Sequence, residues 1–169
     1  MATTHTMGAF ERSLAALDVG FSRTDPDGFD AALSDAITEP AVGARLGFEG
    51  LALPESVTLD PSPRELEEAV TGVTAASFAV AEYGSLILPS TPDGSEIVSV
   101  FCDHHVAVLA ESDLVLDVPT AFARLSEEVG EARASAIVAT GPSATADMGE
   151  LVRGAHGPKT VDVLLVEGL

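Results

Sequence analysis

The apolar run TVDVLLVE, Thr160–Glu167, constrains the fold of this chain more than any other segment. It is too continuously apolar for a strand with one face in water, and so is the earlier stretch Ala136–Ala139. Strands of that kind belong to sheets that are covered on both faces, usually parallel ones. Since helical patterns precede and separate these strands, the sequence predicts an α/β fold with three layers and a mostly parallel sheet.

Helical spacing and capping residues predict the helices. Leu14 and Leu17 continue an apolar stripe, and Asp25 before a proline is typical of a helix start. Ser62–Glu65 combines a cap, a proline at the first helical position and the glutamate of a capping box. Thr120 caps a later pattern, VPTAFARLSEEV. The predicted helices cover roughly residues 10–17, 26–38, 63–71, 74–84 and 118–129.

Short apolar runs between turn residues predict the strands. SLILPS and EIVSVF flank an Asp-Gly turn at Asp93–Gly94, which predicts a β-hairpin inserted into the fold. The predicted strands cover roughly residues 41–43, 85–90, 96–101, 105–111, 135–140 and 160–167. With no repeat and no long linker, we expect a single domain over 1–169, in which helices of residues 1–40 pack on an α/β core of residues 41–169.

Charge is the extreme feature of the composition. The chain has 27 acidic and 8 basic residues, a net charge of −19, and its carboxylates are spread along the whole length. Molar salt screens such self-repulsion, so the pattern favours a halophilic source. Nucleic acid is excluded as a partner because no basic stripe is available to neutralise phosphates.

The remaining bulk features bear on compartment and redox chemistry. No apolar run reaches the roughly 20 residues of a membrane span, and the first residues do not form a signal peptide. We therefore expect a cytoplasmic protein. Cys102 is the single cysteine, which excludes an internal disulfide and any cysteine-rich cluster within this chain.

The segment TGPSATAD, Thr140–Asp147, is the first candidate site. It follows a predicted strand, and open α/β sheets bind ligands outside the carboxyl ends of their strands. It lacks the glycine and lysine pattern of a phosphate loop, and Asp147, in the first turn of a predicted helix, would repel a phosphate. Either Ser143 or Thr145 caps that helix.

Two other functions of the same segment are to be weighed. A ligand carboxylate or hydroxyl held by Ser143 and the turn amides stays open, whereas a triad of Ser143, Asp147 and His156 lacks the nucleophile elbow. His156 either contacts a ligand or caps carbonyls, and the second is favoured. A helix is predicted between Asp147 and His156. Its residues Met148, Leu151 and Val152 are expected to face the protein core, and Gly154 is expected to end it.

Two further segments carry polar groups. The segment FCDHH, Phe101–His105, places Cys102 and His104 on one face of a strand and Asp103 and His105 on the other, so the four cannot all converge on one metal ion. A metal site completed by His156 from across the fold stays open. A turn with a half-buried cysteine is favoured there. Glu82 lies at a predicted turn before Gly84, where it either orients a ligand or satisfies backbone N–H groups.

Three motifs together resemble the LUD domain family. GVTAASFAVAEYGSLIL is similar to its Gly-Val-Thr…Ala-Glu-Thr-Gly-Thr-Leu signature, with Tyr83 in place of a threonine. HHVAVL resembles its His-Ile-Ala-Val strand, with His105 as the matching histidine. TGPSATADMGELVRGAHGPKTVDVLLV resembles its Ser-Gly-Pro-Ser-x-Thr-Ala-Asp-Ile-Glu…Gly-Val-His-Gly-Pro ending, although Met148–Gly149 replaces Ile-Glu. The resemblance covers roughly residues 40–167.

The resemblance implies a fold like glucosamine-6-phosphate deaminase, ribose-5-phosphate isomerase and CoA transferases. It also implies a role in oxidising L-lactate to pyruvate, alongside an iron-sulfur subunit and a cysteine-rich subunit that would hold the iron-sulfur clusters. This chain would then bind a small organic acid or organise its partners. The positions that match the family motifs are Glu82, Gly84, His105, Gly141, Pro142, Ser143, Thr145, Asp147, His156, Gly157 and Pro158.

Two other functions compete with this one. The implied fold is shared by isomerases and acyl-CoA transferases, which would make the chain a stand-alone enzyme with Glu82 as its base. A purely structural partner without a small ligand is the third alternative.

Overall fold

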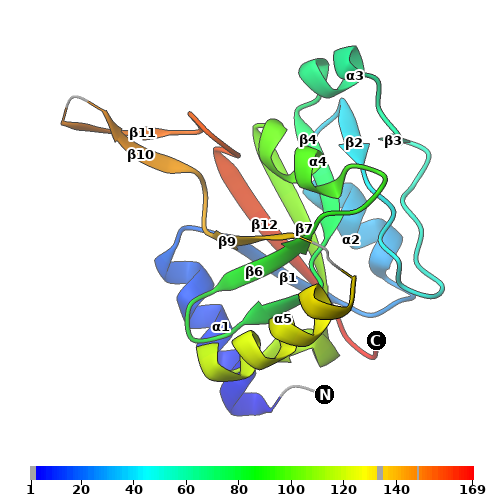
Figure 1. Ribbon diagram of the computed structural model, residues 1–169. Coiled ribbons are helices and arrows are strands. Elements are labelled where there is room, and N and C mark those ends of the chain that lie inside the picture. Colours follow the sequence, from blue (N-terminus) through cyan, green and yellow to red (C-terminus); the bar gives the residue numbers. More distant parts are fainter. Residues whose placement is uncertain (1–2, 133–134, 148) are drawn as a thin grey trace.

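A parallel sheet of six strands forms the centre of the molecule (Figure 1). The computed structural model describes residues 3–132, 135–147 and 149–169. Every neighbouring pair in this sheet is parallel. Its strands, in the order in which they lie side by side, are β1 (Gly20–Thr24), β12 (Thr160–Val166), β7 (His104–Ala110), β4 (Thr71–Ala75), β2 (Ala41–Gly43) and β3 (Val57–Leu59).

A second sheet and a hairpin complete the strands. The second sheet has four strands in the order β8 (Leu114–Val115), β5 (Phe78–Val80), β6 (Ser85–Pro89) and β9 (Ala136–Thr140). Its pairs β5–β6 and β6–β9 are antiparallel. The hairpin of β10 (Ala144–Asp147) and β11 (Glu150–Arg153) extends away from the rest of the molecule (Figure 1).

The two faces of the central sheet pack into separate cores. On one face, Val163 and Leu165 of β12 contact the cluster that contains Phe10 of α1 and Leu86 of β6. On the other face, Leu164 of β12 joins the cluster around α2. The helices are α1 (Thr4–Ala16), α2 (Phe29–Ala36), α3 (Pro63–Glu68), α4 (Ser95–Phe101) and α5 (Val118–Ala132), with a 3-10 turn at Glu111–Asp113. The predicted α/β fold with a mostly parallel central sheet is confirmed.

Several predicted elements are present with shifted ends. Ser62 and Glu65 form the predicted capping box, but α3 ends at Glu68. Asp25 accepts a hydrogen bond from Gly28, so α2 begins three residues beyond the predicted start. Asp117, not Thr120, supplies the side-chain oxygen at the start of α5, because it accepts from the Thr120 N–H. Among the described residues, no helix combines the length and apolarity needed to cross a membrane.

The predicted hairpin around Asp93–Gly94 is wrong. Residues 95–101 form the helix α4, on which Val98 packs against Val42 and Cys102. Gly94 has a φ of 79°, which only glycine adopts readily, and this turn starts a helix instead of joining two strands. Three β-branched residues in EIVSVF concealed the helical spacing of Val98 and Cys102.

The predicted helix over residues 74–84 is also wrong. This segment contains the end of β4, then β5, then a turn to β6. All of β5 is buried between layers, so its apolar residues show neither a helical nor an alternating pattern. The expectation that residues 1–40 contribute helices alone missed β1, an edge strand of the central sheet.

The helix predicted after Asp147 is the hairpin β10–β11. Leu151 and Val152, expected to face the core, are 69% and 39% exposed, and Met148 lies outside the described residues. Gly149 has a φ of 88°, as a tight hairpin turn requires, and Gly154 follows the hairpin instead of a helix. β9 is likewise less covered than expected, since Val138 is 58% exposed.

Candidate functional site

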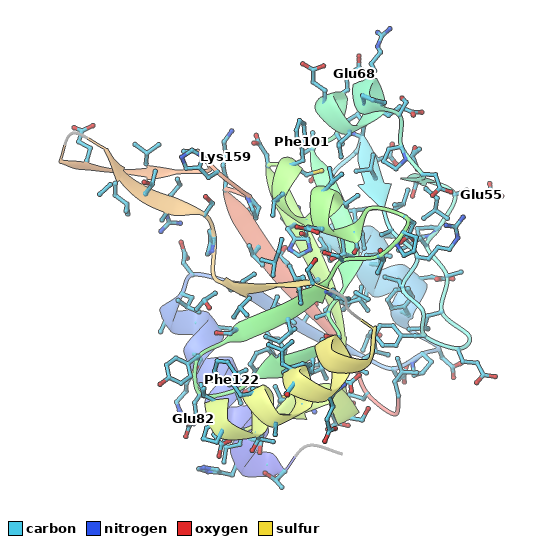
Figure 2. The ribbon with its side chains drawn as sticks, viewed as in Figure 1. Glu55, Glu68, Glu82, Phe101, Phe122 and Lys159 are labelled. Carbon is cyan, nitrogen blue, oxygen red and sulfur yellow. The ribbon has the colours of Figure 1, made fainter. Side chains whose placement is uncertain are left out.

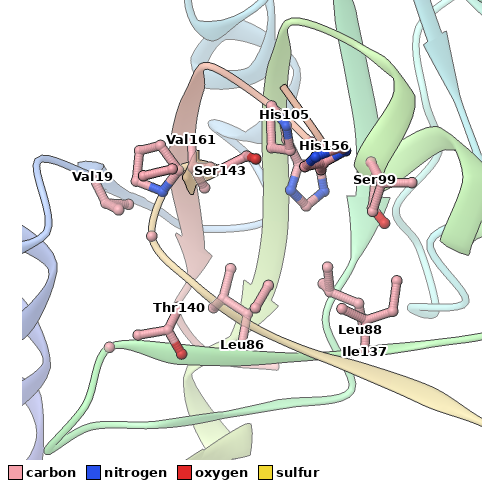
Figure 3. Close-up of a pocket in the computed structure, with 18 of the residues that line it drawn as sticks. Val19, Leu86, Leu88, Ser99, His105, Ile137, Thr140, Ser143, His156 and Val161 are labelled. Atoms are coloured by element: carbon pink, nitrogen blue, oxygen red, sulfur yellow. The ribbon is translucent and has the colours of Figure 1, made fainter. Parts of the chain in front are cut away.

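A cavity of about 280 Å³ lies between the central sheet and the smaller sheet (Figure 3). Leu86 and Leu88 of β6 and Ile137 of β9 contribute apolar surface from the smaller sheet, and Val161 of β12 contributes it from the central sheet. Ser99 of α4 adds a hydroxyl. In the view of Figure 3, the side chains of two histidines lie between Ser143 and Ser99, with Leu86, Leu88 and Ile137 below them.

The cavity lies at the amino ends of the central strands. His105 and Val161 line it, and each is the second residue of its strand. The rule that places ligands at the carboxyl ends of parallel strands therefore misplaced the site. TGPSATAD does follow a strand, as predicted, but that strand, β9, belongs to the smaller sheet. The carboxyl end of β9 lies beside the amino ends of the central strands, because Thr140 lines the same cavity as His105 and Val161.

Backbone hydrogen bonds bring two turns of the last motif together. The Ser143 N–H donates to the Pro158 carbonyl at 2.8 Å, and the Gly154 N–H donates to the Ser143 carbonyl at 2.9 Å. The Lys159 N–H in turn donates to the Asp103 carbonyl at 2.7 Å, just before β7. The base of the hairpin is thereby held against the amino ends of β7 and β12.

Two glycines are required by close approach at this rim. A Cβ atom on Gly157 would lie 3.1 Å from the Cβ of Ser143, so any side chain there would displace the serine. Gly141 has a φ of 73°, and a Cβ on it would lie 3.3 Å from Leu17 of the α1–β1 turn. Gly157 therefore leaves room for Ser143, and Gly141 leaves room for Leu17.

His105 is one of the two most deeply buried polar residues that line the cavity, together with Ser99. His105 is 2% exposed, and its Nε2 lies 2.9 Å from the Thr74 hydroxyl oxygen on β4. Burial, with a smaller contribution from the charge of His104, lowers the pKa of His105 to about 4. Its imidazole is therefore neutral at physiological pH.

His104 lies on the opposite face of β7, as strand alternation predicts. Its Nε2 lies 2.9 Å from the Asp162 carboxylate, and its Nδ1 lies 3.3 Å from the Thr71 hydroxyl. Cys102 precedes β7 and packs against α4, where burial raises the pKa of its thiol to about 11. A protonated thiol is a poor metal ligand. Among the described residues, no group of three or more histidine, cysteine, aspartate or glutamate side chains is suitably placed to hold a metal ion.

The structure brings together most of the residues that match the family motifs. Those that line the cavity are Gly84, His105, Gly141, Pro142, Ser143, His156, Gly157 and Pro158. His156 is exposed at the mouth of the cavity, and no hydrogen bond from it to a described residue supports the carbonyl-capping alternative.

Three of the candidate residues lie elsewhere. Glu82 is exposed in the turn between β5 and β6 and borders a separate surface depression beside α1. Thr145 and the backbone of Asp147 belong to β10, where Asp147 pairs with Glu150. Because no helix starts at Asp147, neither Ser143 nor Thr145 is a helix cap, and the helix-end argument against a phosphate does not apply.

Sequence reasoning missed three hydroxyl residues of the site. Thr140 and Ser99 line the cavity, and Thr74 contacts His105 from behind. Ser99 was concealed because α4 was taken for a strand. Thr74 belongs to the Gly-Val-Thr motif, but its segment was assigned to a helix, and only strand pairing places it next to His105.

Comparisons with known proteins agree on one family. The LUD domain sequence model matches residues 62–166. Lactate utilization protein C of Bacillus licheniformis is 32% identical over 112 residues, which cover 64% of this chain and 47% of that protein. YkgG of Escherichia coli, an uncharacterized protein, is 30% identical over 108 residues, which cover 61% of this chain and 46% of that protein. The chain thus spans less than half the length of these curated relatives.

A solved structure shares the fold. The crystal structure of a DUF162 family protein from Deinococcus radiodurans superposes with a TM-score of 0.76 at 20% sequence identity. The superposition covers 98% of this chain and 99% of the other. At this identity the likeness supports the architecture alone, whereas the LUD domain match extends over well more than half of the sequence. The chain therefore belongs to the LUD domain family.

Proposed function

We propose that this protein acts in L-lactate utilization, by holding a small organic acid in the cavity between its two sheets. The observation that carries this proposal is the convergence of the family motifs. Ser143, His156 and His105 come from three separate segments and line one cavity. Two relatives, 32% and 33% identical to this chain over the aligned residues, are named lactate utilization protein C.

The lining suits a small anion with an apolar group. Although the chain has 27 acidic residues, none of the described residues that line the cavity is an aspartate or a glutamate. Ser143 and His156, at the mouth, supply donors for a carboxylate, while Leu86 and Val161 offer apolar surface to a methyl group. The Ser143 N–H is already used by Pro158, so the side chains rather than this amide would bind the acid.

Electron transfer would take place in partner subunits. Oxidation of L-lactate to pyruvate releases two electrons and two protons, and this chain offers a single thiol, Cys102, for iron-sulfur ligation. That thiol is buried and its pKa is raised, so it does not fit a cluster site. We therefore propose that the chain works in the cytoplasm with an iron-sulfur subunit and a cysteine-rich subunit that carry the clusters.

The alternative of a stand-alone enzyme with Glu82 as its base receives no support from the site. Glu82 is exposed and lies on the outer side of the turn, away from the cavity that the other motif residues share. A general base must lie within hydrogen-bonding reach of the proton that it removes.

Calorimetric titration of the purified protein with L-lactate and pyruvate tests the binding. We expect saturable binding that weakens roughly tenfold in Ser143→Ala, since a hydrogen bond to a charged group is lost. Thr145→Ala, in the hairpin outside the cavity, is the matched control and should bind as the wild type does. No binding of either acid by the wild type would contradict the proposal.

The partnership needs a separate experiment in the source organism. A tagged chain isolated at native salt should retain an iron-sulfur protein, and deletion of the gene should abolish growth on L-lactate. A chain that purifies alone, in a strain whose deletion mutant grows normally on lactate, would overturn this part.

A further inference from the structure

One ring nitrogen of His105 has no hydrogen-bond partner among the described residues. Nε2 is within hydrogen-bonding distance of Thr74, whereas no hydrogen bond joins Nδ1 to any described residue. Among the described residues, no fully buried side-chain nitrogen or oxygen lacks a partner, so Nδ1 must retain some contact with solvent. His105 is 2% exposed and lines the cavity, so that contact is with the cavity.

The partner of Nε2 leaves the tautomer of His105 free. A threonine hydroxyl both donates and accepts, so Thr74 accepts from Nε2–H in one tautomer and donates to Nε2 in the other. In the first tautomer Nδ1 is an acceptor toward the cavity, and in the second it is a donor. The neighbouring His104 has no such choice, because the Asp162 carboxylate only accepts and fixes a hydrogen on Nε2.

This arrangement suits a ligand group that occurs as an alcohol or as a ketone. A buried alcohol hydroxyl carries a hydrogen that needs an acceptor, whereas a ketone oxygen only accepts and needs a donor. One neutral tautomer of His105 offers the acceptor and the other offers the donor, and neither takes on charge. The burial that keeps His105 neutral also makes an ionic partner costly at this depth. The inner end of the cavity is therefore suited to an uncharged oxygen, and the carboxylate belongs at the mouth.

We propose that Nδ1 of His105 hydrogen-bonds the 2-hydroxyl of a 2-hydroxy acid or the 2-keto oxygen of the corresponding keto acid, and that Thr74 positions it by matching either tautomer. This inference rests on the proposed binding of a small acid in the same cavity. It assigns His105 the role of recognising the carbon that is oxidised, and Ser143 with His156 the role of holding the carboxylate.

Nitrogen-15 NMR of the histidine side chains tests this directly. In protein labelled at both ring nitrogens, saturating L-lactate should give an unprotonated Nδ1 at His105, and pyruvate should give a protonated Nδ1. His104 is the internal control, and its Nε2 should stay protonated with both acids. If cavity residues shift on titration while both His105 nitrogens keep their free-state values, the inference fails and the proposed function stands. If no residue shifts, both fail.

A matched pair of substitutions separates the role of Thr74 from its packing. Thr74→Val keeps the shape but removes the hydroxyl, so we expect binding of both acids to weaken roughly tenfold. Thr74→Ser keeps the hydroxyl and should stay within about twofold of the wild type. Equal binding by the wild type and a folded Thr74→Val protein would overturn the positioning role.

Substitutions of His105 keep the proposal testable even if removal of the whole ring disturbs the core. An asparagine amide lies near the position of Nδ1, whereas a glutamine amide reaches the position of Nε2. His105→Asn should therefore retain more affinity for both acids than His105→Gln, provided that both variants show native circular dichroism. The reverse order, or equal affinities, would contradict contact through Nδ1.

Discussion

His104 and His105 are adjacent in the chain and occupy opposite environments. The ring of His104 contacts the carboxylate of Asp162. The exposed ion pair of Asp103 and Lys159 lies directly before the strands that carry these two residues. His105 faces a cavity in which no described lining residue is an aspartate, glutamate, lysine or arginine. Since strand alternation alone separates the two rings, a shift of one residue in β7 would exchange the histidine that contacts a carboxylate for the histidine that lines the cavity.

The comparison extends to the whole molecule. The described surface carries exposed ion pairs such as Arg45–Asp60 and Arg64–Glu68, and in the whole sequence 27 acidic residues face 8 basic ones. The cavity keeps its neutral lining inside this acidic shell. Acidic charge is therefore a property of the surface, and it is excluded from the place where a small anion would bind.

A change in salt concentration should have the largest effect on stability, because it acts on the repulsion among the surface carboxylates. At about 0.1 M salt the Debye length is near 10 Å, against about 3 Å at 1 M, so repulsion among the carboxylates is no longer screened. We expect the fold to loosen in low salt, with a lower melting temperature by circular dichroism. An unchanged melting temperature would contradict adaptation to high salt.

Acid should lower the stability of the fold through the buried, neutral His105. The pKa of His105 is about 4 in the folded state against 6.5 for an ordinary histidine, so between these values the unfolded chain binds more protons. The stability that His105 retains at neutral pH is lost as the pH falls from 6.5 through 4, by about 3 kcal/mol in all.

Urea unfolding at pH 7 and pH 5 measures this loss. His105→Gln cannot titrate, so its unfolding free energy should change less between the two pH values than that of the wild type. His104→Gln is the control for the adjacent position. If the unfolding free energy changes equally between the two pH values in the wild type and in His105→Gln, then His105 is not buried in neutral form.

Crowding at the mouth should affect binding more than stability. Gly157→Ala places a methyl group against Ser143, so we expect affinity for L-lactate to fall roughly tenfold while the melting temperature changes little. The combined effect with Ser143→Ala should be less than the product of the two, because both act on one serine hydroxyl. If the two substitutions multiply in their effects on affinity, then Gly157→Ala does not act through the Ser143 hydroxyl.

The smallest effect is expected at the hydrogen bond between His104 and Asp162. The Asp162 side chain is 40% exposed, so Asp162→Asn should cost less than about 1 kcal/mol in unfolding free energy. The NMR signals of His104 should move, and acid binding at His105 should not. A loss of acid binding would mean that the two faces of β7 are coupled.

Local signals predicted the elements whose chemistry is contained within a few residues. The capping box of Ser62 and Glu65 and the buried run of β12 depend on nearest neighbours or on uniform burial, and both are present. β5, α4 and the hairpin β10–β11 were assigned wrongly for one shared reason. Each is short, and its burial or exposure is set by a distant segment, so the local apolar pattern carries no clear period.

The candidate site divides in the same way. The motif residues around Gly141 and His156 could be found because they resemble a family, and Thr140 lies directly beside them. Thr74 and Ser99 could not be assigned, since Thr74 meets His105 only through the pairing of β4 with β7. Resemblance also proposed Glu82, which the turn after β5 directs away from the cavity.

By itself, the sequence determined a parallel α/β core, an acidic surface and membership in the LUD domain family. These follow from composition, from long apolar runs and from motifs, all of which are local. Only the tertiary structure decided that the cavity lies at the amino ends of the central strands. It also decided that one of two adjacent histidines lines this cavity with a nitrogen that bonds to none of the described residues. Both outcomes depend on which strands become neighbours, and that choice is made by packing between segments far apart in the chain.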